Sequence, residues 1–222
     1  MARIGDSLAG KRVYVTQIDE FMGPALVDAF RAHDAAVLGA RGAEEAALRA
    51  TGHIDVLVCN LGVPAPSTRA HEVGDAEWRS VFAGMVDPLP RLFRAVLPQM
   101  LERRAGKIVV MGSATALRGQ KRTSTYAAAR GAQLAYVRAV GAEVAAHNVQ
   151  VNLIAQNFIE NPMYYPPEVQ ALPAFRERLK REVPANRLGT AQEDALFAVF
   201  LASNEVCFIT GQAIPFSGGW VG

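Results

Sequence analysis

Apolar runs and amphipathic segments alternate along almost the whole chain. Six short apolar runs are typical of buried strands, and the segments between them have the apolar spacing of helices. The predicted strands cover residues 11–16, 35–39, 54–59, 107–111, 149–154 and 212–216. The predicted helices cover residues 24–33, 43–50, 78–100, 125–146 and 191–202, with a bend expected in the third helix near Pro88 and Pro90.

Apolar strands that alternate with helices favour a parallel sheet covered on both faces. No repeat or linker divides the sequence, so we predict one α/β domain over residues 1–222. Its expected architecture is a Rossmann-like three-layer αβα sandwich with a mostly parallel sheet. The main irregular segment, residues 157–173, follows a strand end, which is where open α/β sheets bind ligands.

Composition and charge narrow the class of protein. The 222 residues can bury a sizeable core, and a net charge of +2 gives no reason to expect a nucleic-acid partner. No apolar run reaches the length of a membrane span, and the first residues lack a signal-peptide core, so we expect a cytoplasmic protein. Cys59 and Cys207 lie in apolar runs and are expected to be buried free thiols, with no disulfide and no metal site.

Ser113, Tyr126 and Arg130 carry the candidate chemistry. Ser113 follows a predicted strand, Tyr126 comes 13 residues later, and Arg130 lies four residues further on the same predicted helix. Residues four apart share one helix face, and a cation beside a tyrosine favours the phenolate form that can accept a proton. The spacing therefore suits proton removal from an alcohol, although the tyrosine–cation pair alone is a common chance match.

Several further motifs resemble the short-chain dehydrogenase/reductase superfamily. They follow that family's order and spacing: Asn60-Leu61-Gly62, Arg187-Leu188-Gly189-Thr190, Phe200-Leu201-Ala202-Ser203, Ile209-Thr210-Gly211-Gln212 and Ser217-Gly218-Gly219. The resemblance covers almost the whole length and implies the same fold.

The chain departs from that family where a dinucleotide would bind. Residues 16–23 replace the glycine-rich turn that lets a backbone approach a pyrophosphate, and Asp19 and Glu20 would repel phosphates. The stretch between Ala40 and Asp55 is short, so the sheet is expected to lack its usual third strand and a flanking helix. Other positions differ from the family pattern as well: Arg130 replaces the active lysine, Met85 replaces an asparagine, and Gln156-Asn157 replaces Pro-Gly.

This combination resembles the halohydrin dehalogenases, which share the fold but use no nicotinamide. The resemblance implies that Tyr126 is the general base, Ser113 orients the substrate oxygen and Arg130 favours the phenolate. It also implies a halide or nucleophile pocket formed by Phe21, Gln156, Asn157, Phe158, Ile159 and Tyr165, although proline often stands where Gln156 is found. The shape of the substrate pocket is expected to depend on Leu61, Val63, Thr115 and Leu117.

The implied reaction converts vicinal haloalcohols to epoxides and halide without a cofactor, and the reverse opens epoxides with halide, azide, cyanide or nitrite. A homotetramer is implied too, since small residues on the Tyr126 helix allow close helix packing. Two alternatives stay open. One is a nicotinamide-dependent reductase with an unusual phosphate loop, and the other is a non-catalytic relative that serves as an oligomeric or binding module. Three single-residue questions stay open: whether Phe21 is plain core, whether Tyr164 or Tyr165 faces the pocket, and whether Trp220 reaches a neighbouring subunit or is a buried anchor.

Overall fold

The six apolar runs form one parallel sheet in the computed structural model, which describes residues 3–42 and 45–221. The strand order is β2-β1-β3-β4-β5-β6, and every neighbouring pair is parallel. The strands are β1 (Arg12–Val15), β2 (Ala36–Gly39), β3 (Val56–Cys59), β4 (Gly106–Met111), β5 (Val149–Gln156) and β6 (Ala213–Phe216). The predicted parallel α/β fold is confirmed.

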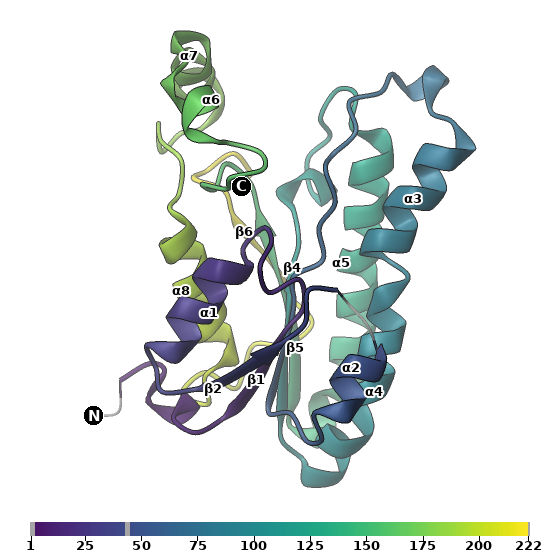
Figure 1. The fold of residues 1–222 in the computed structure, drawn as a ribbon, viewed down its shortest axis with the longest axis vertical. Coiled ribbons are helices and arrows are strands. Elements are labelled where there is room, and N and C mark those ends of the chain that lie inside the picture. Colours follow the sequence, from purple (N-terminus) through teal and green to yellow (C-terminus); the bar gives the residue numbers. More distant parts are fainter. Residues whose placement is uncertain (1–2, 43–44, 222) are drawn as a thin grey trace.

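Helices cover both faces of this sheet, as Figure 1 shows, with α1 and α8 on one face and α3, α4 and α5 on the other. The helices are α1 (Gly23–Arg31), α2 (Glu45–Ala50), α3 (Asp75–Met85), α4 (Pro88–Arg103), α5 (Ser124–Val144), α6 (Pro167–Ala171), α7 (Pro173–Glu182) and α8 (Ala191–Ala202). Leu26 and Phe30 of α1 and Val199 of α8 belong to one buried cluster, and Leu92 and Phe93 of α4 belong to the other. None of the described helices combines the length and apolarity that a membrane span requires.

The sheet is shortened at the β2 edge, as the short segment before Asp55 predicted. Among the described residues between β2 and β3, α2 is the only regular element. Within residues 3–42 and 45–221, β2 is therefore the last strand of the sheet on that side. The predicted start of α2 at Ala43 lies outside the described residues.

Three local expectations were wrong. The long helix predicted over residues 78–100 is two helices, because the chain leaves α3 at Met85 and Pro88 begins α4, where proline needs no N–H partner. The segment 157–173 is not wholly irregular, since α6 and the start of α7 fall within it. Cys59 is buried, but Cys207 is exposed, because its apolar run lies in a turn after α8 rather than in a strand.

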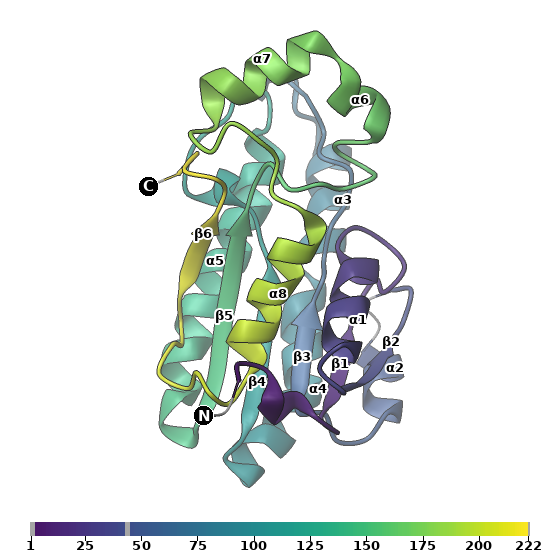
Figure 2. The same cartoon turned by 90° about the vertical axis from the view of Figure 1, so that its left-hand side faces the viewer.

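The strand order positions the candidate site. β1 is flanked by β2 on one side and by β3 on the other, so the chain first builds the sheet to one side of β1 and then crosses back to build it on the other side. Such a switch point opens a crevice outside the carboxyl ends of the strands. Figure 2 shows α6 and α7 above that end of the sheet.

Candidate active site

A cavity of about 250 Å³ lies at the carboxyl ends of β1, β3, β4 and β5. Segments far apart in the sequence meet there, which the parallel topology requires because all of these strands end at the same edge. The cavity lining includes most of the residues predicted for the site: Phe21, Leu61, Ser113, Thr115, Tyr126, Arg130, Gln156, Asn157, Phe158, Ile159 and Tyr165.

Two residues expected to shape the substrate pocket do not border this cavity. Val63 packs into a small cluster with Val81, Met85 and Tyr126, behind the Tyr126 ring. Leu117 is 36% exposed, because it ends the short helical turn Ala114–Ala116 at the protein surface. The expectation for these two side chains therefore does not match their positions.

Ser113 is held at the end of β4 by its own backbone turn. The Thr115 N–H donates to Ser113 Oγ over 3.2 Å, and the Ser113 and Thr115 hydroxyls share a hydrogen bond of 2.9 Å. Ser113 is 5% exposed, so its rotation is restricted. When the Thr115 hydroxyl is the donor of that shared bond, the Ser113 proton is free to be donated to an oxygen in the cavity.

Tyr126 and Arg130 lie one helical turn apart on α5 and stack on one another. The Arg130 guanidinium carbon is 5.0 Å from the centroid of the Tyr126 ring, within the range of a cation–π contact. Both side chains are buried. The positive charge is therefore held close to the phenol in a site that screens it weakly.

Backbone carbonyls fix the Arg130 guanidinium. Its Nη1 donates to the Leu61 carbonyl over 2.9 Å and to the Met111 carbonyl over 2.8 Å, so the ends of β3 and β4 both hold it. Nη1 also donates to Gln133 Oε1, and Gln133 Nε2 donates in turn to the Met85 carbonyl over 2.6 Å. Gln133 thus links the arginine to the end of α3 at Met85, where the family has an asparagine. No pattern in the amino-acid sequence indicated this role of Gln133.

The turn after β1 is locked against the turn after β3. The Gln17 amide donates to the Gly62 carbonyl over 3.1 Å and accepts from the Gly62 N–H over 2.8 Å. The Asn60 amide donates to the carbonyls of Gln17 and Glu20 over 3.0 and 2.9 Å. These four hydrogen bonds tie the turn after β1 to the turn after β3, in the segment where dinucleotide-binding relatives have a glycine-rich turn.

Phe21 closes the same turn from the cavity side. It has a left-handed backbone with φ of 49°, and its ring lies so close to Gly62 that an added Cβ there would meet ring atoms at 3.0 Å. Its ring centroid is 6.3 Å from that of Tyr164. Phe21 is therefore a cavity wall as well as a packing residue.

The segment after β5 was expected to line a halide or nucleophile pocket, where backbone N–H groups can bind an anion. The Asn157 N–H donates to the Phe216 carbonyl, and the Phe158 N–H is taken by Asn157 Oδ1 over 2.9 Å. Among the described residues, Ile159 N–H has no acceptor, so it is the group of this turn that is available to a ligand. Phe158 has a φ of 55°, a conformation that the Asn157 cap supports.

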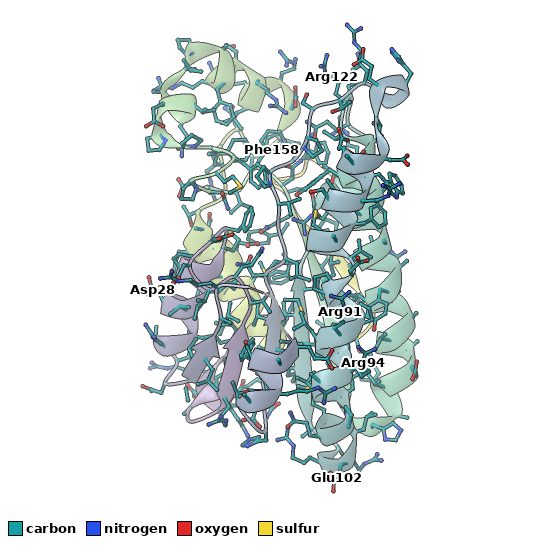
Figure 3. All side chains as sticks on the ribbon, turned by 45° about the vertical axis from the view of Figure 1, so that its right-hand side comes forward. Asp28, Arg91, Arg94, Glu102, Arg122 and Phe158 are labelled. Carbon is teal, nitrogen blue, oxygen red and sulfur yellow. The ribbon has the colours of Figure 1, made fainter. Side chains whose placement is uncertain are left out.

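Aromatic rings and a second cation surround Phe158, which lies between the α6–α7 pair and the long helices in Figure 3. Tyr165 stacks on it with centroids 5.9 Å apart, and Trp220 meets it edge-on at 6.0 Å. The Arg178 guanidinium carbon lies 5.3 Å from the Phe158 ring centroid. Trp220 is only 6% exposed and packs within its own chain, which agrees with a buried anchor.

Both adjacent tyrosines border the cavity. Burial raises the pKa of Tyr165 to about 12. Burial also raises the pKa of Tyr164 far above its ordinary value, with a further contribution from the nearby Tyr126. Both phenols are therefore neutral at working pH. The sequence predicts Tyr165 for the pocket and leaves open whether Tyr164 faces it, because the loop conformation decides which of two adjacent side chains points inward.

The charge of the cavity suits anions. Within the described part of the chain, its lining has two cationic side chains, Arg130 and Arg178, and no carboxylate. Residues 3–42 and 45–221 contain no cluster of His, Cys, Asp or Glu that could hold a metal ion. The arrangement can position an alcohol between Ser113 and Tyr126 and can accept a small anion near Ile159.

Comparison with known proteins gives two kinds of relative. The family described as enoyl-(acyl carrier protein) reductase matches residues 27–221. The 3-oxoacyl-(acyl-carrier-protein) reductase FabG of Salmonella typhimurium is 34% identical over 169 residues, which are 76% of this chain and 67% of that protein. An acetoacetyl-CoA reductase of Shinella zoogloeoides is 34% identical over 170 residues, which are 76% of this chain and 68% of that protein.

Two similar solved structures are described as dehalogenases. A structure described as a dehalogenation enzyme matches with a TM-score of 0.90 and 29% identity, over 97% of this chain and all 100% of the other. A halohydrin dehalogenase, HheC, bound to ethyl (2S)-oxiran-2-ylacetate matches with a TM-score of 0.87 and 26% identity, over 94% of this chain and 96% of the other.

Proposed function

The chain belongs to the short-chain dehydrogenase/reductase superfamily, and from that membership we propose that it acts as a cofactor-independent halohydrin dehalogenase. In this proposal it converts vicinal haloalcohols to epoxides and halide, and it opens epoxides with small anions in reverse. The similarity to two dehalogenase structures over nearly the whole chain supports it.

The observation that carries the proposal is the locked turn after β1. The Gln17 amide makes two hydrogen bonds to Gly62, and the Phe21 ring packs on the same residue. Dinucleotide binding requires an open, glycine-lined turn so that the pyrophosphate can reach backbone N–H groups and a helix N-terminus. A chain that fills this turn with side chains while it retains Ser113, Tyr126 and Arg130 favours chemistry without a nicotinamide.

In the proposed ring closure, the substrate hydroxyl lies between Ser113 and Tyr126. Ser113 donates a hydrogen bond to the substrate oxygen, and Tyr126 as phenolate accepts its proton. The oxygen then forms a bond to the neighbouring carbon as the carbon–halogen bond breaks and halide leaves with the bonding electrons. Arg130, held 5.0 Å from the Tyr126 ring centroid, stabilises the phenolate that the step requires.

The departing halide needs a place where negative charge is stabilised. The free Ile159 N–H can donate to it, and Phe21, Phe158 and Tyr165 form apolar walls. The Arg178 guanidinium lies over the Phe158 ring, and its charge is partly offset by the ion pair of its Nε with Glu182 over 3.1 Å. Because no carboxylate is among the described lining residues, nothing in the cavity repels a leaving anion. The same pocket would accept azide, cyanide or nitrite in the reverse reaction.

A nicotinamide-dependent reductase is the second candidate, favoured by the sequence relatives, which are reductases at 34% identity. It would require the Gln17 and Asn60 hydrogen bonds to break before a cofactor could enter. A saturable change in nicotinamide fluorescence on titration with NADH or NADPH would support this candidate. A non-catalytic relative is the third reading, and it predicts neither cofactor binding nor turnover.

The decisive experiment is halide release from 1,3-dibromo-2-propanol at mildly alkaline pH without nicotinamide. Native protein should release bromide, and Tyr126→Phe should reduce release to background while it keeps its circular dichroism spectrum. Tyr136→Phe is the matched control, since Tyr136 lies on the same helix but packs edge-on against Phe93 in the core. Release by Tyr126→Phe at the native rate would exclude Tyr126 as the base, and no release by any of the proteins would exclude this activity.

We also propose that the protein is a single domain that assembles as a homotetramer through α5. Several small residues of α5 remain half-buried or exposed in the isolated chain: Ala127, Ala128, Gly131, Ala132 and Ala135. A Cβ added at Gly131 would meet no atom, so another helix could approach closely there. Light scattering coupled to size-exclusion chromatography measures the mass directly.

A further inference from the structure

The carboxylate of Glu77, on α3, joins two segments that border the candidate active site. Its Oε1 accepts a hydrogen bond from the Thr125 hydroxyl over 2.7 Å, and its Oε2 accepts one from the Thr68 hydroxyl over 2.6 Å. Thr125 is 1% exposed and directly precedes Tyr126 in the first turn of α5. Thr68 lies in the loop between β3 and α3. One side chain thus holds both segments, and we call Glu77, Thr68 and Thr125 the Glu77 clamp.

Backbone contacts make the Glu77 clamp part of one cavity wall. The Thr68 N–H donates to the Arg122 carbonyl over 3.0 Å, and Arg122 Nη2 donates to the Ser67 carbonyl over 3.2 Å. The loop before α3 and the loop before α5 are therefore tied to each other next to the clamp. Between them, these loops and the start of α5 contribute four residues to the cavity lining: Ala65, Gln120, Thr123 and Tyr126.

The first turn of α5 lacks the usual support of a helix N-terminus. Its N-cap residue, Thr123, makes no side-chain hydrogen bond to the helix, and the first turn contains no acidic residue. A carboxylate near a helix N-terminus is favourable, because the unpaired backbone N–H groups there carry partial positive charge. The hydrogen bonds from Thr125 and Thr68 hold the pKa of Glu77 below its ordinary value, so this carboxyl is ionised at working pH. Glu77 therefore supplies from α3 the negative group that α5 lacks.

We propose that Glu77 is a positioning residue, which fixes the first turn of α5 and Tyr126 through Thr125, and fixes one cavity wall through Thr68. Two kinetic effects follow. Displacing Tyr126 from the substrate oxygen slows proton transfer, since a shift of about 1 Å can cost about a hundredfold in rate. Loosening the wall weakens substrate binding. These effects rest on the proposed function, whereas the fixing of the two segments does not.

The two halves of the Glu77 clamp can be removed separately. Thr125→Val and Thr68→Val each replace a hydroxyl by a methyl group of similar size. In halide release from 1,3-dibromo-2-propanol, Thr125→Val should lower kcat by about tenfold or more and change KM by less than about twofold. Thr68→Val should raise KM by about threefold or more and leave kcat near its native value. Glu77→Ala should show both changes.

Two further variants show whether the hydrogen bonds of Glu77 carry the effect. In Glu77→Gln the amide oxygen can accept from Thr125 and the amide nitrogen can donate to Thr68, so this variant should retain a higher kcat than Glu77→Ala. Asp75→Asn is the matched control on α3, because Asp75 pairs only with Arg79 at the surface among the described residues, and it should leave kcat and KM unchanged.

Amide hydrogen exchange tests the positioning without a substrate. Thr125→Val should speed exchange in residues 124–131, the first two turns of α5, because that end of the helix opens more often. Thr68→Val should speed exchange in residues 65–69, Glu77→Ala should do so in both segments, and Asp75→Asn should do so in neither.

The two measurements separate the possible failures. Native kcat and KM in both threonine variants would overturn the inference, and so would an equal change of both constants in each, which marks a general loss of folded protein. Native exchange rates in both segments of Glu77→Ala would overturn it whether or not halide is released. If native protein releases no halide, the proposed function falls, and the exchange measurement alone decides whether Glu77 fixes the two segments.

Discussion

Asp194 is a buried carboxyl without a hydrogen-bond partner among the described residues, and we predict that it makes stability depend on pH. It lies in the first turn of α8, is 0% exposed, and neither of its oxygens accepts a hydrogen bond from a described residue. Its neighbour Glu193 already serves the helix N-terminus through a capping box with Thr190. Burial alone raises the pKa of Asp194 from 3.8 to about 8.

The sign and size of the effect follow from the difference between the folded and unfolded chains. The raised pKa means that the unfolded chain releases this proton first, so stability is greatest below pH 4 and falls as the pH rises through 8. One pKa unit corresponds to about 1.4 kcal/mol, so the free energy of unfolding is lowered, relative to its value below pH 4, by ~4 kcal/mol at pH 7 and by ~6 kcal/mol above pH 8. A domain of this size has a free energy of unfolding of about 5–15 kcal/mol, so the cost is a large share of it.

Asp194→Asn keeps the shape of the side chain and cannot ionise. Urea unfolding at pH 5, 7 and 9 should show that native protein loses about 1.4 kcal/mol per pH unit between pH 5 and 8, and little more above pH 8, whereas the variant retains this stability. The unpaired amide costs about 1–3 kcal/mol at every pH, so the variant should be clearly more stable only in the alkaline range. Asp28→Asn is the control, because Asp28 points outward from α1 (Figure 3) and should keep the native pH dependence.

Parallel stability curves for native protein and Asp194→Asn would refute this reasoning. That result would mean that the carboxyl is hydrated or paired when the protein is in solution, and that its burial does not oppose ionisation.

Two further predictions concern the site. Gly62→Ala should push the Phe21 ring out of the cavity wall, because the new Cβ would meet the ring at 3.0 Å, and halide release should fall. Gly119→Ala is the control: an added Cβ meets no atom there, so halide release should be unchanged. Arg130→Lys should keep the fold but lower the maximal rate of halide release by about tenfold or more. The reason is that a lysine ammonium cannot donate to both strand-end carbonyls and still lie over the Tyr126 ring. An unchanged rate would show that a positive charge at this position is sufficient.

Local pattern was enough to predict most of the fold. The predicted helix over residues 191–202 coincides with α8, and all six strands lie within about two residues of their predicted limits. Apolar periodicity carries this information because each element must present an apolar face to the same core. The short segment before Asp55 likewise predicted a sheet that ends at β2, since too few residues remain for another strand and helix.

The candidate triad was also visible in the sequence, because residues four apart on a helix and a residue at a strand end have positions that the fold class fixes. Only the tertiary structure brought Gln17 to Gly62, which is 45 residues away, and Gln133 to Met85, which is 48 residues away. The same holds for the choice between two adjacent tyrosines, for Val63 and Leu117 outside the cavity, and for the exposed Cys207. These features depend on contacts between distant segments, and such contacts are set by how loops pack once the sheet has formed, not by the periodicity of any one segment.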